Sequence, residues 1–351
     1  MEKLSRSIFE KSNQNGQIPV PKDTLITVIV THFNYSYFVG QALHSVARQS
    51  HTNFECVIVD DGSDQSHLAQ LKLLLTSLDD KRFRVIELAE NKGQTFALFE
   101  GLRYSSGEFV SLLDPDDLYG SDFLEKMLRC HLNPCVYASV AACEMGLFRI
   151  GGSILTNSYV GFKSKALDDE KLMHYEASLS DFGFSTYYPP EATGWLWATT
   201  SSLMFRRDAL EALRRETYMP NTKVHADTYC VFGAHMLGGT LFVDEVLSWR
   251  GLHKDNAAEA SWVTNSKQNR HRPSFDDVST QVKFFAAQTL FENGTVSYMR
   301  PYVMGKMLKA HFSTDDVEKL LGLAPEFAAK IVAQTSILQP DLLRPRMKLE
   351  P

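Results

Sequence analysis

The sequence lacks the features that mark several large classes of protein. No apolar run approaches the roughly 20 residues that a membrane-spanning helix requires. Residues 1–23 are polar and contain no long apolar core, so we do not expect a secretory signal peptide. The net charge of −6 argues against a nucleic-acid partner, because general nucleic-acid binders need an excess of Lys and Arg to replace counterions. We therefore expect a globular protein.

Cysteine is scarce and shows no metal-binding or disulfide spacing. The number is odd and no C-x-x-C pair occurs, which argues against a zinc site and against a disulfide framework. We expect reduced thiols and a cytoplasmic location, with a position at the inner face of the membrane left open. The five cysteines are Cys56, Cys130, Cys135, Cys143 and Cys230.

Both common glycine-rich phosphate-binding motifs are also absent. No G-x-G-x-x-G follows the first predicted strand, and no G-x-x-x-x-G-K-[ST] occurs anywhere in the chain. An acidic site can still bind a diphosphate when a divalent cation lies between the two. Mg²⁺ and Mn²⁺ prefer oxygen ligands, and phosphate oxygens can complete their coordination shell.

Apolar runs alternate with helical patterns in the first third of the chain. With 44% hydrophobic and 22% charged residues, the composition is that of an ordinary globular protein. Four strand patterns joined by short helical segments predict a parallel α/β sheet flanked by helices. The expected strands lie at 26–31, 54–63 (with its turn), 83–88 and 108–113.

The rest of the chain divides less clearly. We expect an N-terminal extension at 1–24, an α/β domain at 25–272 with halves at 25–132 and 133–272, and a helical region at 273–351. A returning strand is expected in WLWATTSSLMFRR, with Trp197 in the core, and a final strand pair in TLFVDEVLSWRGLH. Ser313 and Asp316 predict a capped helix start. The C-terminal helices would dock on the α/β domain, form a homo-oligomer or contact a membrane surface; the first two are favoured because short helices need packing.

Unusual polar residues follow three of the expected strands. In a parallel α/β sheet, ligands bind outside the carboxyl ends of the strands, so these residues should lie together. Asp114 and Asp116 are two positions apart in an extended segment and should face the same side. The alternative is a solvated acidic turn that caps the next helix. The residues are Thr31, Phe33 and Asn34, then Asp60, and then Asp114, Asp116 and Asp117.

Four motifs in this region resemble one known family. THFN, VDDGS, NKG and DPDD occur in that order and are similar to the first turn, second-strand turn, pre-helix loop and D-x-D-D segment of family 2 glycosyltransferases. The resemblance covers roughly residues 25–132 and continues more weakly through SSLMFRRDAL, HADTYCVFGAHMLGG and VLSWRGLH. It implies a GT-A fold: a Rossmann-like, mostly parallel sheet flanked by helices, here with an α-helical C-terminal extension.

The resemblance also implies roles for individual residues on the donor side. Asp60 would accept a hydrogen bond from the N3–H of uracil, and Asp114 would approach the ribose. Asp116 would bind Mn²⁺ or Mg²⁺, with His253 as a second metal ligand or a diphosphate contact. Lys92 either pairs with phosphate or is solvated. The full set of implied nucleotide-binding residues is Thr31, Phe33, Asn34, Asp60, Lys92, Gly93, Asp114 and Asp116.

On the acceptor side, the resemblance implies that Asp227 is the catalytic base. Trp195 and Trp197 alternate along the expected returning strand, so with Trp197 in the core, Trp195 is a candidate contact for the acceptor or the sugar, as is Asp117. One base opposite the leaving group predicts inversion at the anomeric carbon. Two positions depart from the family pattern: His32 stands where a small residue or proline is common, and Ala226 where an acid is frequent.

The expected activity is that of a hexosyl or N-acetylhexosaminyl transferase. It would move a sugar from a nucleotide diphosphate donor, with UDP favoured, to a glycan, a lipid-linked sugar or another hydroxyl acceptor, as in polysaccharide biosynthesis. A nucleotidyltransferase would need a Gly-rich basic loop after the first strand, and THFNYSYFVG lacks one. A non-catalytic binding or assembly protein on a degenerate transferase scaffold remains the alternative, favoured by Ala226.

Overall fold

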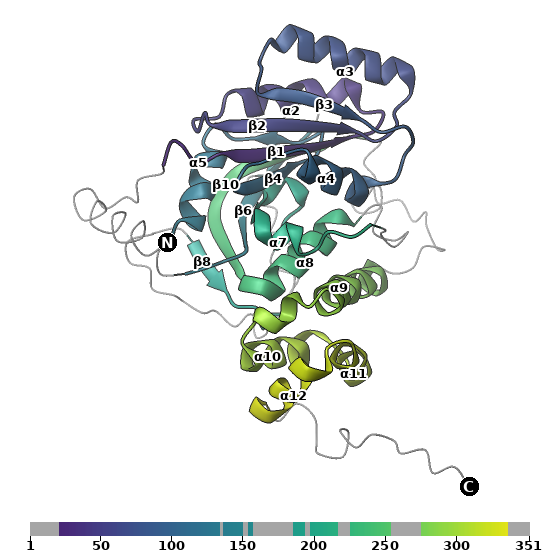
Figure 1. Cartoon of the computed structure of the whole chain (residues 1–351). Coiled ribbons are helices and arrows are strands. Elements are labelled where there is room, and N and C mark those ends of the chain that lie inside the picture. Colours follow the sequence, from purple (N-terminus) through teal and green to yellow (C-terminus); the bar gives the residue numbers. More distant parts are fainter. Residues whose placement is uncertain are drawn as a thin grey trace, which may run out of the picture.

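The computed structural model describes residues 21–133, 136–149, 154–156, 185–193, 197–216, 225–253 and 275–335. Within these residues the strands join into one ten-stranded sheet (Figure 1). The strands are β1 (Ile26–His32), β2 (Phe54–Asp60), β3 (Phe83–Glu87), β4 (Phe109–Leu113), β5 (Leu118–Tyr119), β6 (Val140–Arg149), β7 (Ile154–Thr156), β8 (Ser185–Tyr188), β9 (Leu203–Arg206) and β10 (Thr240–Leu252).

Helices flank the sheet, and the C-terminal part of the described chain is helical (Figure 1). The helices are α2 (Ser36–Ala47), α3 (Gln65–Leu78), α4 (Gln94–Arg103), α5 (Phe123–His131), α7 (Arg207–Glu211), α8 (Ala226–Gly238), α9 (Phe275–Glu292), α10 (Pro301–His311), α11 (Thr314–Leu323) and α12 (Pro325–Gln334), with short 3₁₀ turns η2 (Thr200–Ser202) and η4 (Thr295–Tyr298).

The strand order is β3-β2-β1-β4-β9-β6-β10-β5, with β7 beside β6 and β8 beside β10. Strands β1 to β4, β6 and β10 run in one direction, and β5, β7, β8 and β9 run in the other. The predicted α/β fold with a mostly parallel sheet is therefore confirmed. The antiparallel β9 sits between β4 and β6 and separates the sheet into two parallel groups.

Alternate residues of the central strands pack into two cores, as the pleat of a strand dictates. Val28 of β1 belongs to the core beneath α2 and α5, whereas Ile29 belongs to the core beneath α4 and α8. Because β1 and β2 are covered on both faces, Ile26–Val30 and Cys56–Asp60 are fully buried.

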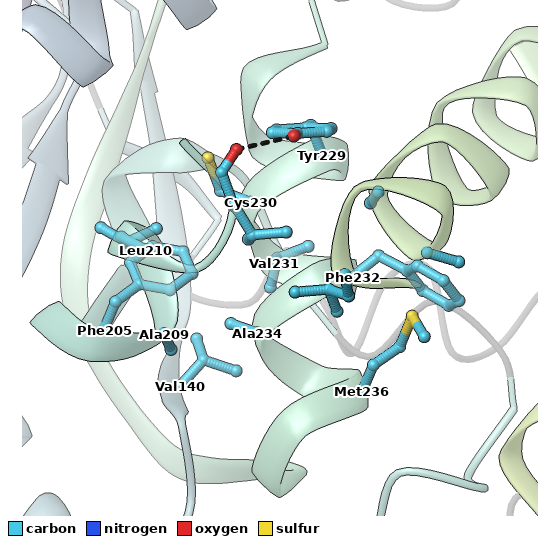
Figure 2. Packing of buried hydrophobic residues seen from close by; sticks show 14 of the residues in the cluster. Val140, Phe205, Ala209, Leu210, Tyr229, Cys230, Val231, Phe232, Ala234 and Met236 are labelled. Carbon is cyan, nitrogen blue, oxygen red and sulfur yellow. Dashed lines mark hydrogen bonds between the residues drawn. The ribbon is translucent and has the colours of Figure 1, made fainter. Parts of the chain in front are cut away.

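The C-terminal helices dock on the α/β part of the chain, one of the alternatives that the sequence left open. Helix α9 packs along α8, and Phe285 and Leu290 belong to the same buried cluster as Phe205 and Phe232. Figure 2 shows this cluster around Phe205, Tyr229 and Phe232, with α9 beside α8. A homo-oligomer and membrane contact stay predictions. In the described part of the chain, no helix has the length and apolar character that a bilayer crossing needs.

Two smaller predictions in this region are confirmed and one is wrong. Ser313 caps α11, because its hydroxyl accepts a hydrogen bond from the backbone N–H of Asp316 at 3.2 Å. Trp197 is 2% exposed and lies in the core. The expected final strand pair is instead the single strand β10, whose register against β6 shifts on either side of Val246. These irregularities bend one strand so that it pairs first with β8 and then with β5.

The cysteines of the described residues are free thiols, as predicted. Cys56, Cys143 and Cys230 are buried and Cys130 is partly buried. Burial raises the pKa of the Cys56 thiol, which keeps this side chain neutral and unreactive. Cys135 lies outside the described residues.

Three enclosed histidines are held neutral by the fold. Burial lowers the pKa of His131 and His235 to about 3 and that of His311 to about 4. His311, at the end of α10, donates from Nε2 to the carbonyl of Pro190 at 3.1 Å and so helps to join the C-terminal helices to the sheet domain. Each histidine gains its proton more easily in the unfolded chain.

We expect the free energy of unfolding to fall as the pH drops below about 6.5, the unfolded pKa of histidine. The folded pKa of His311 is lower, so its contribution is complete above pH 6.5 and is lost towards pH 4. Denaturant titrations at several pH values of the wild type and of His311→Gln, which keeps a donor for Pro190, measure this contribution. Between pH 6.5 and pH 4, the free energy of unfolding of the variant should fall by roughly 3 kcal/mol less than that of the wild type. An unchanged pH profile would contradict a neutral, partly buried His311; His44→Gln, at the exposed surface of α2, is the control.

Candidate active site

The turn after β2 is fixed to the loop before α4. Gly62 has φ of 73°, and a Cβ there would lie 2.5 Å from the carbonyl carbon of Glu90, so only glycine fits this approach. The carboxylate of Asp61 accepts the backbone N–H groups of Lys92 and Gly93, both at 2.8 Å. The VDDGS and NKG motifs are thus two halves of one local structure.

Asp60 lies at the end of β2 and is paired with His32 at the end of β1. The distance from His32 Nδ1 to Asp60 Oδ2 is 2.7 Å, and the backbone N–H of Ser63 donates to Oδ1 at 3.0 Å. Burial alone would raise the pKa of Asp60, but the hydrogen bonds from His32 and Ser63 outweigh it and hold the pKa below its ordinary value. Asp60 is therefore a fixed, ionised hydrogen-bond acceptor.

The end of β1 places an aromatic ring at the surface. The side chain of Phe33 is 42% exposed, as suits a ring that stacks on a base. Asn34 follows in the left-handed region with φ of 58°. Its N–H donates to Ser63 Oγ at 2.9 Å and its Oδ1 accepts from the N–H of Asp64 at 2.8 Å. Asn34 thus links the chain after β1 to the turn after β2 through both its backbone N–H and its side chain.

The acidic turn after β4 has one buried member. Asp117 is 2% exposed, and its two oxygens accept from Ser201 Oγ at 2.6 Å and from the N–H of Gly251 at 2.9 Å. The Ser201 hydroxyl also accepts from the N–H of Asp114 at 3.0 Å. The Asp117 carboxylate therefore ties the acidic turn to η2 and to β10. Its predicted contact with acceptor or sugar stays a prediction.

The pKa of Asp114 depends on the charged side chains around the acidic turn. Burial first, and then the negative charges of Asp116 and Asp227, raise the pKa of Asp114 to about 7, while Arg250 opposes them. Gln94 donates to Asp114 Oδ1 at 2.8 Å and lies 3.5 Å from Thr31 Oγ1. Asp227 is thus within electrostatic reach of the acidic turn, although the two are far apart in sequence.

Asp116 and His253 come together as the sequence predicted. His253 Nε2 lies 3.0 Å from Asp116 Oδ2, and the side chains are only 8% and 12% exposed, respectively. The His253 ring stacks on Phe38 at 4.3 Å between ring centroids, with its other neighbour Tyr35 edge-on at 5.6 Å. A carboxylate oxygen and an imidazole nitrogen are both metal-binding groups, so this pair could hold a divalent cation. Across the described ranges no cluster of three or more potential metal ligands occurs.

The remaining predicted residues lie as follows. Asp227 is in the first turn of α8, where a negative charge is favourable, and accepts from the N–H of Thr228 at 2.7 Å. Lys92 is half-exposed, with its amine 3.8 Å from Glu90 and 4.9 Å from the centre of the Phe96 ring. Trp195 lies outside the described residues.

The family model described as Glycosyl transferase family 2 matches residues 27–213, which is 187 of 351 residues and just over half of the chain. The chain belongs to glycosyl transferase family 2. The match confirms the resemblance carried by the strand-end motifs, and it extends from β1 through β9 to the residues just after α7.

Individual relatives are more distant from this family 2 member. An uncharacterized glycosyltransferase of Nostoc sp. is 22% identical over 261 residues, 74% of this chain and 75% of the relative. A putative teichuronic acid biosynthesis glycosyltransferase, TuaG of Bacillus subtilis, is 36% identical over 107 residues, 30% of this chain but only 40% of the relative. Among solved structures, S. aureus TarS 1–349 in complex with UDP matches with a TM-score of 0.49 and 17% identity over 88% of each chain.

Sequence reasoning missed three side chains around the acidic turn of this glycosyltransferase. Gln94 follows the NKG motif directly, and this position could have suggested its contact with Asp114. Ser201 and Arg250 carried no comparable signal, because their nearness to the acidic residues depends on the return of β9 and β10 to the sheet.

We expect Ser201→Ala to destabilise the protein by about 3 kcal/mol, because it removes a donor to the buried Asp117 carboxylate and an acceptor for the Asp114 N–H. Ser202→Ala is the matched control. Ser202 is equally buried, but its hydroxyl donates to the Thr199 carbonyl, which also accepts from the Ser202 N–H. The control should lose about 1 kcal/mol or less in urea unfolding. Equal losses would contradict the role given to Ser201.

Proposed function

We propose that this family 2 member is an inverting, cation-dependent glycosyltransferase that uses a UDP-sugar. One observation carries the proposal: His253 Nε2 lies 3.0 Å from Asp116 Oδ2 just after β4, and Asp227 is near enough that its charge, like that of Asp116, raises the pKa of Asp114. The proposed base Asp227 and the Asp116–His253 pair would therefore act together at the acidic turn after β4. Sugar transfer needs a base and a diphosphate-binding group at one place, and this arrangement supplies both.

Asp116 and His253 would hold the divalent cation. The cation, when bound, neutralises the charge that develops on the leaving diphosphate. The crowding of Asp114, Asp116 and Asp117 favours its binding, because like charges in a partly buried turn repel until a cation offsets them. The stacked Phe38 ring fixes the His253 imidazole in place.

Asp227 would accept the proton of the acceptor hydroxyl as the new bond forms. The first turn of α8 favours its ionised form, and burial of α8 between the sheet and α9 makes its position rigid. A single base on the face opposite the leaving group gives inversion, and general-base help is worth about 10²- to 10⁴-fold in rate.

The donor base and ribose would be bound by the ends of β1, β2 and β4. Phe33 offers a face for stacking, Asp60 accepts the uracil N3–H, and Asp114 approaches the ribose. For the acceptor, the relative named for teichuronic acid biosynthesis supports a glycan. Transfer to such an acceptor would place this chain in polysaccharide biosynthesis.

We expect Asp227→Asn to lower turnover by about 10²- to 10⁴-fold, because the amide cannot accept the proton, while the affinity for UDP stays within a factor of about two. Turnover is measured as UDP release in the presence of acceptor, and affinity by calorimetry. Asp315→Asn is the control, since Asp315 is also in the first turn of a helix, α11, at the protein surface. Unchanged turnover in Asp227→Asn would favour a non-catalytic binding role instead.

We expect Mn²⁺ to raise the melting temperature of the wild type in the presence of UDP, and Asp116→Asn to abolish most of this rise. The reason is that a binder of the native state stabilises it in proportion to RT ln(1 + [L]/Kd). His253→Gln should weaken the rise without abolishing it. A wild type that shows no Mn²⁺-dependent stabilisation with any nucleotide diphosphate would count against the proposal.

A further inference from the structure

His32 is enclosed beside Asp60 and bound to it directly. Its side chain is 0% exposed, and its Nδ1 lies 2.7 Å from Asp60 Oδ2 and 3.3 Å from Ser63 Oγ. An ionised carboxylate can only accept hydrogen bonds, so Nδ1 carries the proton of the imidazole. With Ser63 donating to Oδ1, each carboxylate oxygen has a fixed donor.

The other ring nitrogen of His32 is in an unfavourable environment. Nε2 is buried and has no hydrogen-bond partner in the part of the chain that the structure describes. A buried polar atom without a partner costs folding free energy, and an apolar side chain of similar size would avoid that cost. The contribution of the imidazole therefore lies at Nδ1, in what it does to Asp60.

We propose that His32 is a positioning residue for donor selection: it holds the Asp60 carboxylate as a fixed acceptor, so that the site takes uracil and rejects cytosine. This inference rests on the proposed function, because it assumes that Asp60 meets the base of a nucleoside diphosphate. It adds His32 as the residue that, through Asp60, sets the preference for uracil over cytosine.

The two bases differ at the atom that Asp60 would meet. Uracil presents an N3–H donor there, whereas cytosine presents an N3 lone pair, and the two rings are nearly equal in size. An acceptor facing a lone pair leaves both groups unpaired and is strongly disfavoured. A carboxylate free to rotate or to take up a proton could donate to cytosine N3. The hydrogen bonds from His32 and Ser63 prevent both changes.

The test compares the affinities for UDP and CDP, each with Mn²⁺, by calorimetry. His32→Leu removes the donor, and His32→Asn keeps an amide N–H near the place of Nδ1. We expect the wild type to prefer UDP, and His32→Leu to bind UDP about tenfold more weakly, which is about 1.4 kcal/mol, with a smaller UDP-to-CDP ratio. His32→Asn should retain most of the ratio. The donor KM should rise in His32→Leu while kcat changes little, since Asp227 is untouched.

His131→Leu is the control for the loss of a buried histidine. His131 donates to the backbone of Met204 and contacts none of the strand-end carboxylates in the described contacts, so its loss should leave the UDP-to-CDP ratio unchanged. A His32→Leu variant that folds and keeps the wild-type ratio, or loses UDP and CDP affinity equally, would overturn the inference alone. A wild type that binds neither UDP nor any other nucleoside diphosphate would overturn the proposed function and this inference together.

Discussion

The crowding of carboxylates after β4 is the constraint on which the rest of the active site depends. Asp117 is buried and bonded to Ser201 and Gly251, and this bonding fixes the turn that carries Asp114 and Asp116. Burial raises the pKa of Asp117 well above its ordinary value, and the neighbouring charges of Asp116 and Asp114 raise it further. Such a turn is unfavourable by itself and becomes favourable when a cation and a diphosphate share its charge.

Segments that are distant in sequence bring further charged and polar side chains to the acidic turn. The bent strand β10 ends beside it, where Arg250 offsets part of its charge and His253 meets Asp116. Helix α8 brings Asp227, and α9 buries the outer side of α8 within the same core (Figures 1 and 2). The C-terminal helices thus support the proposed base indirectly, through the packing of Tyr229, Phe232 and Phe285.

Local sequence patterns predicted the first half of the fold. They could not predict which distant segments of the chain come together. The strands, the strand-end motifs and the meeting of Asp116 with His253 followed from periodicity and family resemblance. The buried role of Asp117 did not, because a third carboxylate in DPDD looks exposed until η2 and β10 close over it. The single strand β10 was missed, because its pairing with β6 shifts register between Val243 and Ser248 and this pairing depends on a distant segment of the chain. The pairing of His32 with Asp60 needed the parallel register of β1 and β2, which no local pattern specifies.

A crystal structure with UDP and Mn²⁺, with anomalous scattering recorded to locate manganese, tests the central claim most directly. The account predicts one strong anomalous peak bound by Asp116 and His253 and by the diphosphate of UDP, with Asp227 facing the same side. A manganese peak elsewhere, or a UDP diphosphate bound without contact to this pair, would contradict it.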